Sequence, residues 1–222
     1  MPCIDSAMNR AEAIEKLIEK QLEALPLVVR KEQLSIMCLE DWSGTSKWGD
    51  IPEEVRHELE SGELTENEAS SRYDKVLLLW LGDRLAGATN EYVTTLLASY
   101  GIPVEIDGGE PLSLESCPCC GRRTIEIRGE YEICTVCWWE DDGQDNDTAS
   151  TVYGGPNYGI SLTQARYNFL KYGIYDPNRS DLLSKREPAN KYVPGRKFRL
   201  VDGNTVIELD SEWSAQIDSI AL

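Results

Sequence analysis

Four of the seven cysteines form two Cys-x-x-Cys pairs, Cys117 with Cys120 and Cys134 with Cys137, and thirteen residues separate the pairs. Four thiolates complete the tetrahedral coordination of one Zn²⁺ ion, and a tight turn can aim both sulfurs of a pair inward. Because such a set leaves no open position for a substrate, the spacing predicts a zinc ion with a structural role. A catalytic dithiol is a rival interpretation of one pair, but two pairs at this separation favour a metal.

The other three cysteines have no partner at this spacing. Cys119 lies inside the first pair, and we expect it to be a small buried side chain because one zinc ion needs only four ligands. An alternative ligand or a redox-sensitive thiol is the other interpretation of Cys119. Cys3 and Cys38 are expected to be ordinary reduced residues. Reduced Cys-x-x-Cys pairs are typical of cytoplasmic proteins, and the cytoplasm is the predicted compartment.

An acidic segment follows the second pair, with five carboxylates among the eight residues 140–147. It could bind a basic partner by mimicking a polyanion, or it could be a solvated loop. A calcium loop is disfavoured because the spacing does not match an EF-hand. Of the two tryptophans before this segment, one is expected to pack beside the metal and the other to anchor an interface. The predicted partner-binding residues are Trp139, Glu140, Asp141, Asp142, Asp145 and Asp147.

The whole chain is strongly acidic, with 39 Asp and Glu against 22 Lys and Arg and a net charge of −17. Such a charge repels nucleic-acid phosphates and anionic membranes, and it attracts basic proteins. Solubility alone is the other interpretation. Seven basic side chains gather between Arg179 and Arg199, where we expect them to pair with the acidic segment within the fold or with an acidic part of a partner. No apolar run approaches the roughly 20 residues of a membrane span, and we find no secretory signal.

The apolar pattern predicts an α+β protein with two parts. Residues 1–107 are expected to form a helical domain, whose helices pack on one another as a small bundle. Capping boxes at Asn9 with Glu12 and at Thr65 with Glu68 predict where two of these helices begin.

Residues 115–222 are expected to form a small zinc-ribbon-like domain. A hairpin of residues 124–128 and 131–134 is predicted between the cysteine pairs. An added helix is predicted to begin at Ser161 and to end at Gly173. A second hairpin, over residues 198–209, is predicted at the C-terminal end around Asp202-Gly203.

Three segments, in order along the chain, carry a resemblance to a known family. They are Cys117-Pro-Cys-Cys-Gly121, Tyr131-Glu-Ile-Cys-Thr-Val-Cys-Trp-Trp-Glu-Asp-Asp142 and Gly159-Ile-Ser-Leu-Thr-Gln-Ala-Arg-Tyr-Asn-Phe-Leu-Lys-Tyr-Gly173. With these segments, residues 115–175 resemble the CPCC-type cysteine-rich domain family of bacteria. The resemblance implies a zinc-binding module. Because genes of this family often lie near polymorphic toxin systems, it also implies an immunity protein that binds and neutralises a cognate, basic toxin.

Two other classes of function are less consistent with the residues. His57 is the only histidine, and neither a G-x-S-x-G motif nor a P-loop is present, so we do not expect an enzyme. The alternative to the immunity protein is a zinc-ribbon nucleic-acid-binding or regulatory protein. The net charge and the acidic segment beside the second cysteine pair make nucleic acid an unfavourable partner.

Overall fold

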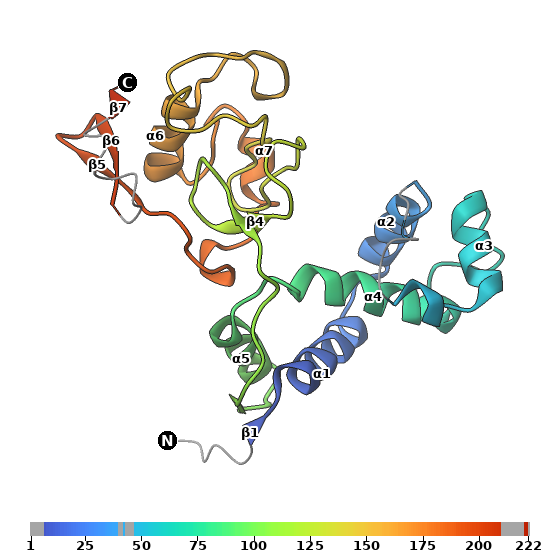
Figure 1. Cartoon of the computed structure of the whole chain (residues 1–222). Helices are drawn as coiled ribbons and strands as arrows, with labels where there is room; N and C mark the ends of the chain where they lie inside the picture. The colour runs from blue at the N-terminus through green and yellow to red at the C-terminus, as the bar shows by residue number, and fades with distance from the viewer. Residues whose placement is uncertain (1–6, 40–41, 43–46, 210–219, 222) are drawn as a thin grey trace. The chain divides into compact units, whose positions relative to one another are not determined.

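A computed structural model describes residues 7–39, 42, 47–209 and 220–221 (Figure 1). The chain forms two compact units, of which the first comprises Met1–Ala86 and Asn90–Pro111 and the second comprises Gly87–Thr89 and Leu112–Leu222. Within the described ranges, no helix is both long and apolar enough to cross a bilayer. That residues 1–107 and 115–222 are separate domains stays a prediction.

The first unit is mainly helical. Ala7–Met8 (β1) and Glu105–Ile106 (β2) form a short parallel pair beside the helices. The helices are α1 Arg10–Glu23, α2 Leu27–Met37, α3 Glu53–Ser61, α4 Asp74–Leu85 and α5 Asn90–Ser99, with the short 3₁₀-helices η1 Trp48–Asp50 and η2 Ser71–Tyr73.

Helix α1 begins at the predicted capping box. The Asn9 side chain accepts a hydrogen bond from the Glu12 backbone N–H, and the Glu12 carboxylate accepts one from the Asn9 N–H. Its apolar side chains repeat at helical spacing, and α1 packs against both α4 and α5 (Figure 1). The buried side chains Leu17, Leu77 and Leu97 lie in the core of this unit, one from each of the three helices.

The predicted helix start at Thr65 and Glu68 is wrong. Both the hydroxyl and the backbone N–H of Thr65 donate to the carboxylate of Glu58, at 2.8 and 3.2 Å. Glu58 thus takes the backbone N–H of Thr65 that the capping box would have given to Glu68, and the Thr65 hydroxyl is also engaged. Residues 65–70 therefore form turns, and η2 and then α4 follow. The Glu58 carboxylate also accepts from Arg72 at 2.6 Å and from the Tyr73 hydroxyl at 2.7 Å, which ties α3 to the beginning of α4.

The second unit has little regular secondary structure around its cysteines and a helix and sheet after them. The tract Gly87–Thr89 belongs to it, because Ala88 bridges to Tyr192 and the Thr89 N–H donates to the Lys191 carbonyl. The elements are β3 Glu115–Ser116, β4 Arg123–Ile125, η3 Gly155–Asn157, α6 Leu162–Tyr172, α7 Ser180–Leu183, η4 Ala189–Lys191, β5 Phe198–Val201, β6 Thr205–Glu208 and β7 Ile220–Ala221.

The hairpin predicted between the cysteine pairs is not formed. Strand β4 pairs with β3, on the other side of the first cysteine pair, and not with residues 131–134. The backbone N–H groups of Glu126 and Ile127 donate to the Glu132 carboxylate, at 2.7 and 2.8 Å. A side chain therefore satisfies donors that the predicted hairpin would have given to backbone carbonyls.

The predicted helix and the C-terminal hairpin are confirmed. The Ser161 side chain caps the beginning of α6, and Gly173 ends it in the left-handed conformation at φ 77°. Strands β5 and β6 pair antiparallel, with Phe198 opposite Glu208, and β7 adds to the other edge of β6. Helix α6 packs against β5 and β6, so the hairpin covers one side of the helix (Figure 1).

Candidate metal centre

The two cysteine pairs sit on turns with the same hydrogen bonds. In the first turn, the Gly121 N–H donates to the Cys117 carbonyl at 2.9 Å, and the Cys117 N–H donates to the Arg122 carbonyl at 2.8 Å. In the second turn, the Trp138 N–H donates to the Cys134 carbonyl at 2.8 Å, and the Cys134 N–H donates to the Trp139 carbonyl at 2.9 Å. Each turn thus presents its two thiols in the same way, although the sequences differ.

The fifth residue of each turn has a left-handed backbone. Gly121 has φ 76°, which a glycine adopts without strain, whereas Trp138 has φ 66° at the equivalent position. A bulky side chain costs roughly 1–2 kcal/mol in this region. The second turn therefore carries strain that the surrounding contacts must offset. The neighbouring segments supply such contacts, because the Tyr175 N–H donates to the Cys137 carbonyl at 3.0 Å and the Glu187 N–H to the Thr135 carbonyl at 2.8 Å.

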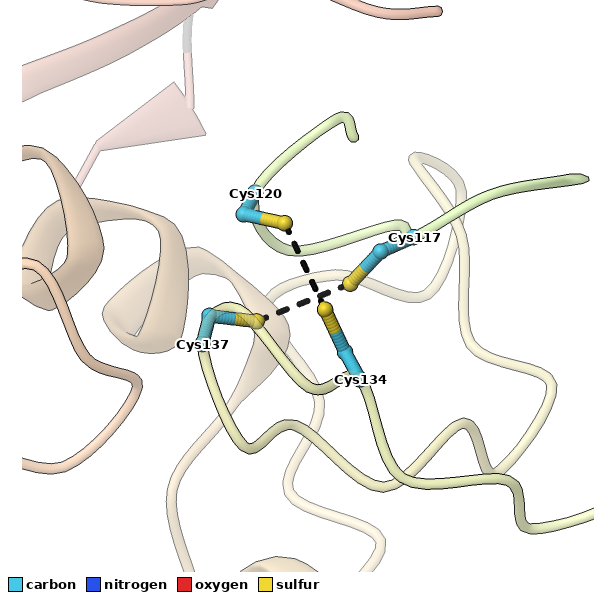
Figure 2. Close-up of side chains that lie close together, drawn as sticks. All are labelled: Cys117, Cys120, Cys134 and Cys137. Atoms are coloured by element: carbon cyan, nitrogen blue, oxygen red, sulfur yellow. Dashed lines mark hydrogen bonds between the residues drawn. The ribbon is translucent and has the colours of Figure 1, made fainter. Parts of the chain in front are cut away.

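The four thiols of these turns converge on one point (Figure 2). The sulfurs of Cys117 and Cys137 are 3.6 Å apart, as are those of Cys120 and Cys134, and all four lie within 4.8 Å of one another. Sulfurs at the corners of a tetrahedron around Zn²⁺ would be about 3.8 Å apart, given a Zn–S bond of about 2.3 Å. A disulfide needs about 2.05 Å, and all four thiols are free. The arrangement could bind one metal ion.

Burial closes this thiol cluster to water. Cys117, Cys134 and Cys137 have no exposed surface, and Cys120 is 7% exposed. Burial would raise the pKa of the Cys134 thiol, but hydrogen bonds from the other three thiols and the Thr124 hydroxyl hold the pKa well below its usual value. The Thr124 Oγ1 lies 3.1 Å from the Cys134 sulfur. Such outer contacts orient metal ligands, and sequence reasoning missed Thr124 because no pattern distinguishes it from an ordinary strand residue.

The remaining cysteines lie outside the cluster or outside the described residues. Cys119 is fully buried and free, it belongs to the core of this unit, and it is not one of the four clustered thiols. Cys38, in the first unit, is half-buried and free. Cys3 lies outside the residues that the structure describes.

Two carboxylates of the acidic segment 140–147 pair with arginines of their own unit. Asp141 is fully buried, and its Oδ2 accepts from Arg128 Nε at 2.7 Å and from the Gly129 N–H at 2.8 Å. Asp145 pairs with Arg196 at 2.9 Å and with Arg128 at 3.2 Å. The Arg196 pair joins the basic segment to the acidic one, as expected for contacts within the fold.

The burial of two side chains corrects the prediction that these residues contact a partner. Trp139 has no exposed surface, and its ring packs edge-on against Tyr175 with centroids 6.2 Å apart. The interface interpretation is wrong for Trp139 and Asp141, since neither side chain reaches the surface. Glu140 and Asp142 are half-buried, and Asp142 accepts from the Gln144 N–H at 3.1 Å. Asp147 is exposed.

One of three comparisons with known proteins matches part of the second unit. Residues 115–191 match the family model described as Cysteine-rich CPCC. The match contains both cysteine turns and α6, and it continues beyond residue 175, where the sequence resemblance was expected to end. A search of curated proteins and a search of solved structures each found no match. The segment 115–191 is therefore a cysteine-rich CPCC domain, in which four buried thiols lie close together.

Proposed function

We propose that the thiol cluster holds one zinc ion that stabilises the second unit. Four thiolates at tetrahedral spacing favour Zn²⁺ or iron, and Zn²⁺ adds no redox chemistry to a closed core. The spacing between the sulfurs and their burial support this proposal. All four positions around the ion would be taken by cysteine, so the ion would organise the fold and would not meet a substrate.

We further propose that the protein acts by binding and not by catalysis. His57, the single histidine, is exposed on α3. Two charged clusters of the second unit are closed ion pairs that hold segments together, Arg128 with Asp141 and Arg196 with Glu208. These residues serve the packing of the second unit, and we infer that recognition of a partner is the function.

The partner that we propose is a basic toxin domain, which this protein would neutralise as an immunity protein in the cytoplasm. One observation carries the choice of a basic partner: the charge is unequal between the units. By sequence, the first unit has 22 acidic and 10 basic residues, a net charge of −12, and the second has 17 and 12, a net charge of −5. A strongly negative surface speeds encounter with a basic protein and disfavours nucleic acid.

The exposed glutamates of α1 are our proposed contact in place of the acidic segment. Glu12, Glu15, Glu19 and Glu23 recur along one side of the helix, and all are exposed. The acidic segment is less suited because Asp141 and Asp145 already pair with arginines.

The test is a pull-down of the tagged protein with the product of the neighbouring gene, at low and at high salt. We expect a stoichiometric complex that weakens as salt rises, together with rescue of cells that express the toxin. Glu15→Lys combined with Glu19→Lys should weaken the complex, and Asp147→Lys, an exposed reversal in the other unit, is the matched control. Absence of a complex with folded, metal-loaded protein would refute the immunity function.

The same preparation tests the nucleic-acid alternative. The basic segment 179–199 favours it, yet Arg196 pairs with Glu208, and Arg179 with Asp181 at 3.1 Å. We expect no salt-sensitive binding to duplex DNA or single-stranded RNA. Tight binding that falls steeply with salt would replace the immunity proposal with this one.

A further inference from the structure

Arg166 is a fully buried arginine that joins α6 to the first cysteine turn. Its Nε donates to the Pro118 carbonyl at 2.8 Å, and its Nη1 donates to Asn146 Oδ1 at 2.8 Å. Its guanidinium lies over the Phe198 ring, with the central carbon 4.5 Å from the ring centroid. The Arg166 side chain thus contacts the first cysteine turn, the acidic segment and the C-terminal hairpin.

The positive charge of Arg166 lacks a close carboxylate. Its nearest ion pair is with Asp145, at 3.8 Å from Nη2, and that Nη2 has no hydrogen-bond partner among the described residues. Arg196, by contrast, reaches Asp145 at 2.9 Å and Glu208 at 2.8 Å. A buried cation without a close partner is costly, so its retention calls for a negative charge elsewhere.

Arg166 still carries its charge at neutral pH. Burial, together with the neighbouring Arg196, lowers the pKa of Arg166 to about 10. The guanidinium is therefore a permanent positive charge inside the CPCC domain, on the residue that holds the carbonyl between Cys117 and Cys119.

The proposed metal centre supplies the missing negative charge. A divalent ion with four thiolates has a formal charge of two minus, and a buried centre of this kind depends on surrounding donors and cations. Arg166 is bonded to the backbone of the turn that carries two of the four thiols. The geometry would satisfy both needs at once, because the under-compensated buried cation donates to the carbonyl of Pro118, the residue next to Cys117.

We propose that Arg166 is a positioning residue of the metal centre, which fixes the first cysteine turn through Pro118 and offsets the charge of the metal-bound thiolates. This inference rests on the proposed metal site. It also links metal binding to more distant segments. Asn146, which accepts from Arg166, donates to Glu208 at 3.0 Å, so the ordering of the acidic segment and of β6 depends on the same arginine.

The experiment compares metal affinity in the full chain and in three variants. Zn²⁺ affinity is measured by competition with a chromophoric chelator, and the thiolate site is observed directly through the charge-transfer absorption of bound Co²⁺. Arg166→Gln removes the positive charge, and Arg166→Lys keeps a positive charge on a shorter side chain. The matched control is Arg186→Gln, which removes an arginine that also donates to a backbone carbonyl, that of Gly173, but from an exposed position.

We expect Arg166→Gln to weaken Zn²⁺ binding by about 10- to 100-fold, the range seen when outer-shell partners of metal ligands are lost. Arg186→Gln should change the affinity by less than about threefold. Arg166→Lys should bind Zn²⁺ more tightly than Arg166→Gln, and it keeps the test informative if the glutamine variant does not fold.

Two results would overturn the inference while leaving the metal site intact. One is a Zn²⁺ affinity for Arg166→Gln equal to that of Arg186→Gln, and the other is an Arg166→Lys variant that binds Zn²⁺ no more tightly than Arg166→Gln. A wild-type chain that gives no Co²⁺-thiolate absorption would instead refute the metal site itself, and the inference with it.

Discussion

Cys119 and Cys134 are equally buried, yet only Cys134 belongs to the four-thiol cluster. The difference comes from position in the turn, because the first and fourth residues of a Cys-x-x-Cys turn aim their sulfurs together and the third does not. Burial alone therefore does not identify a ligand, and the two cysteines offer a paired test of the site.

Cys134→Ser should lose the metal and the ordered packing of the second unit. A structural zinc ion contributes on the order of 10 kcal/mol to folding, and three thiolates with a hydroxyl bind it far less tightly. Cys119→Ser is the matched control and should keep one metal ion per chain. Metal content by mass spectrometry and near-ultraviolet circular dichroism measure the two effects.

Either of two outcomes would contradict this assignment of ligands. Retention of zinc and of the melting transition by Cys134→Ser would exclude Cys134 as a ligand. Loss of zinc by Cys119→Ser would support the alternative interpretation of Cys119, as a thiol that takes part in the site.

At the scale of elements, Gly121 shows why the C-terminal segment can pack onto the first cysteine turn. A Cβ atom there would overlap the backbone carbonyl oxygen of Arg196, and φ is already positive. The Gly195 and Arg196 N–H groups both donate to the Gly121 carbonyl at 2.9 Å. The glycine of the CPCC motif thus serves the approach of another segment as well as the turn itself.

Gly121→Ala should therefore destabilise the second unit more than positive φ alone would. Gly159→Ala is the control, because Gly159 also has φ 81° but a Cβ there meets nothing within 4 Å. We expect the control to cost about 1 kcal/mol of unfolding free energy and Gly121→Ala at least about 2 kcal/mol more. Chemical denaturation followed by tryptophan fluorescence measures both free energies of unfolding. Equal losses for the two variants would mean that the segment around Arg196 moves aside freely.

The Glu58 carboxyl makes the stability of the first unit depend on pH. Burial would raise the pKa of Glu58, but hydrogen bonds from Arg72, Tyr73 and Thr65 outweigh it and lower the pKa to about 2. A depressed carboxyl pKa contributes stability that is complete above the ordinary value near 4.5 and is lost as pH falls toward 2.

We expect the unfolding free energy of the first unit to fall by up to about 3 kcal/mol between pH 4.5 and pH 2 because of Glu58. Glu58→Gln should remove this part of the acid sensitivity. Glu54→Gln, an exposed change on the same helix, should leave it unchanged. Thermal unfolding followed by far-ultraviolet circular dichroism across this pH range decides the matter, and an identical pH profile for wild type and Glu58→Gln would contradict it.

The sequence predicted correctly those helices whose capping residues bond to neighbours a few positions away in the chain. The capping box at Asn9 and the cap pair Ser161 and Gly173 define α1 and α6 as expected, because each cap bonds to residues within four positions. Thr65 and the segment before Glu132 were predicted wrongly for one shared reason. In both cases a buried or half-buried glutamate, distant by several residues, takes the backbone donors that the predicted element would have used.

For the whole molecule, net charge was readable from the sequence, but its distribution was not. The five carboxylates of residues 140–147 suggest an exposed anionic surface, yet the arginines that pair with Asp145 come from residues 128 and 196. Pairs of such sequence separation leave no local pattern. The four cysteines were predictable because metal ligation constrains their spacing, whereas Arg166 meets the cysteine turn only through the folded chain.

The tract Gly87–Thr89 has a consequence for how this domain could be exchanged between proteins. It lies between α4 and α5 in the chain, far before the family match at 115–191, yet its Thr89 N–H donates to the carbonyl of Lys191 within the match. A cassette cut at the limits of the family match would leave this tract behind. Recombination that moves the CPCC domain intact must therefore carry a second, separate piece of gene, so this domain and its helical companion are expected to be inherited as a pair.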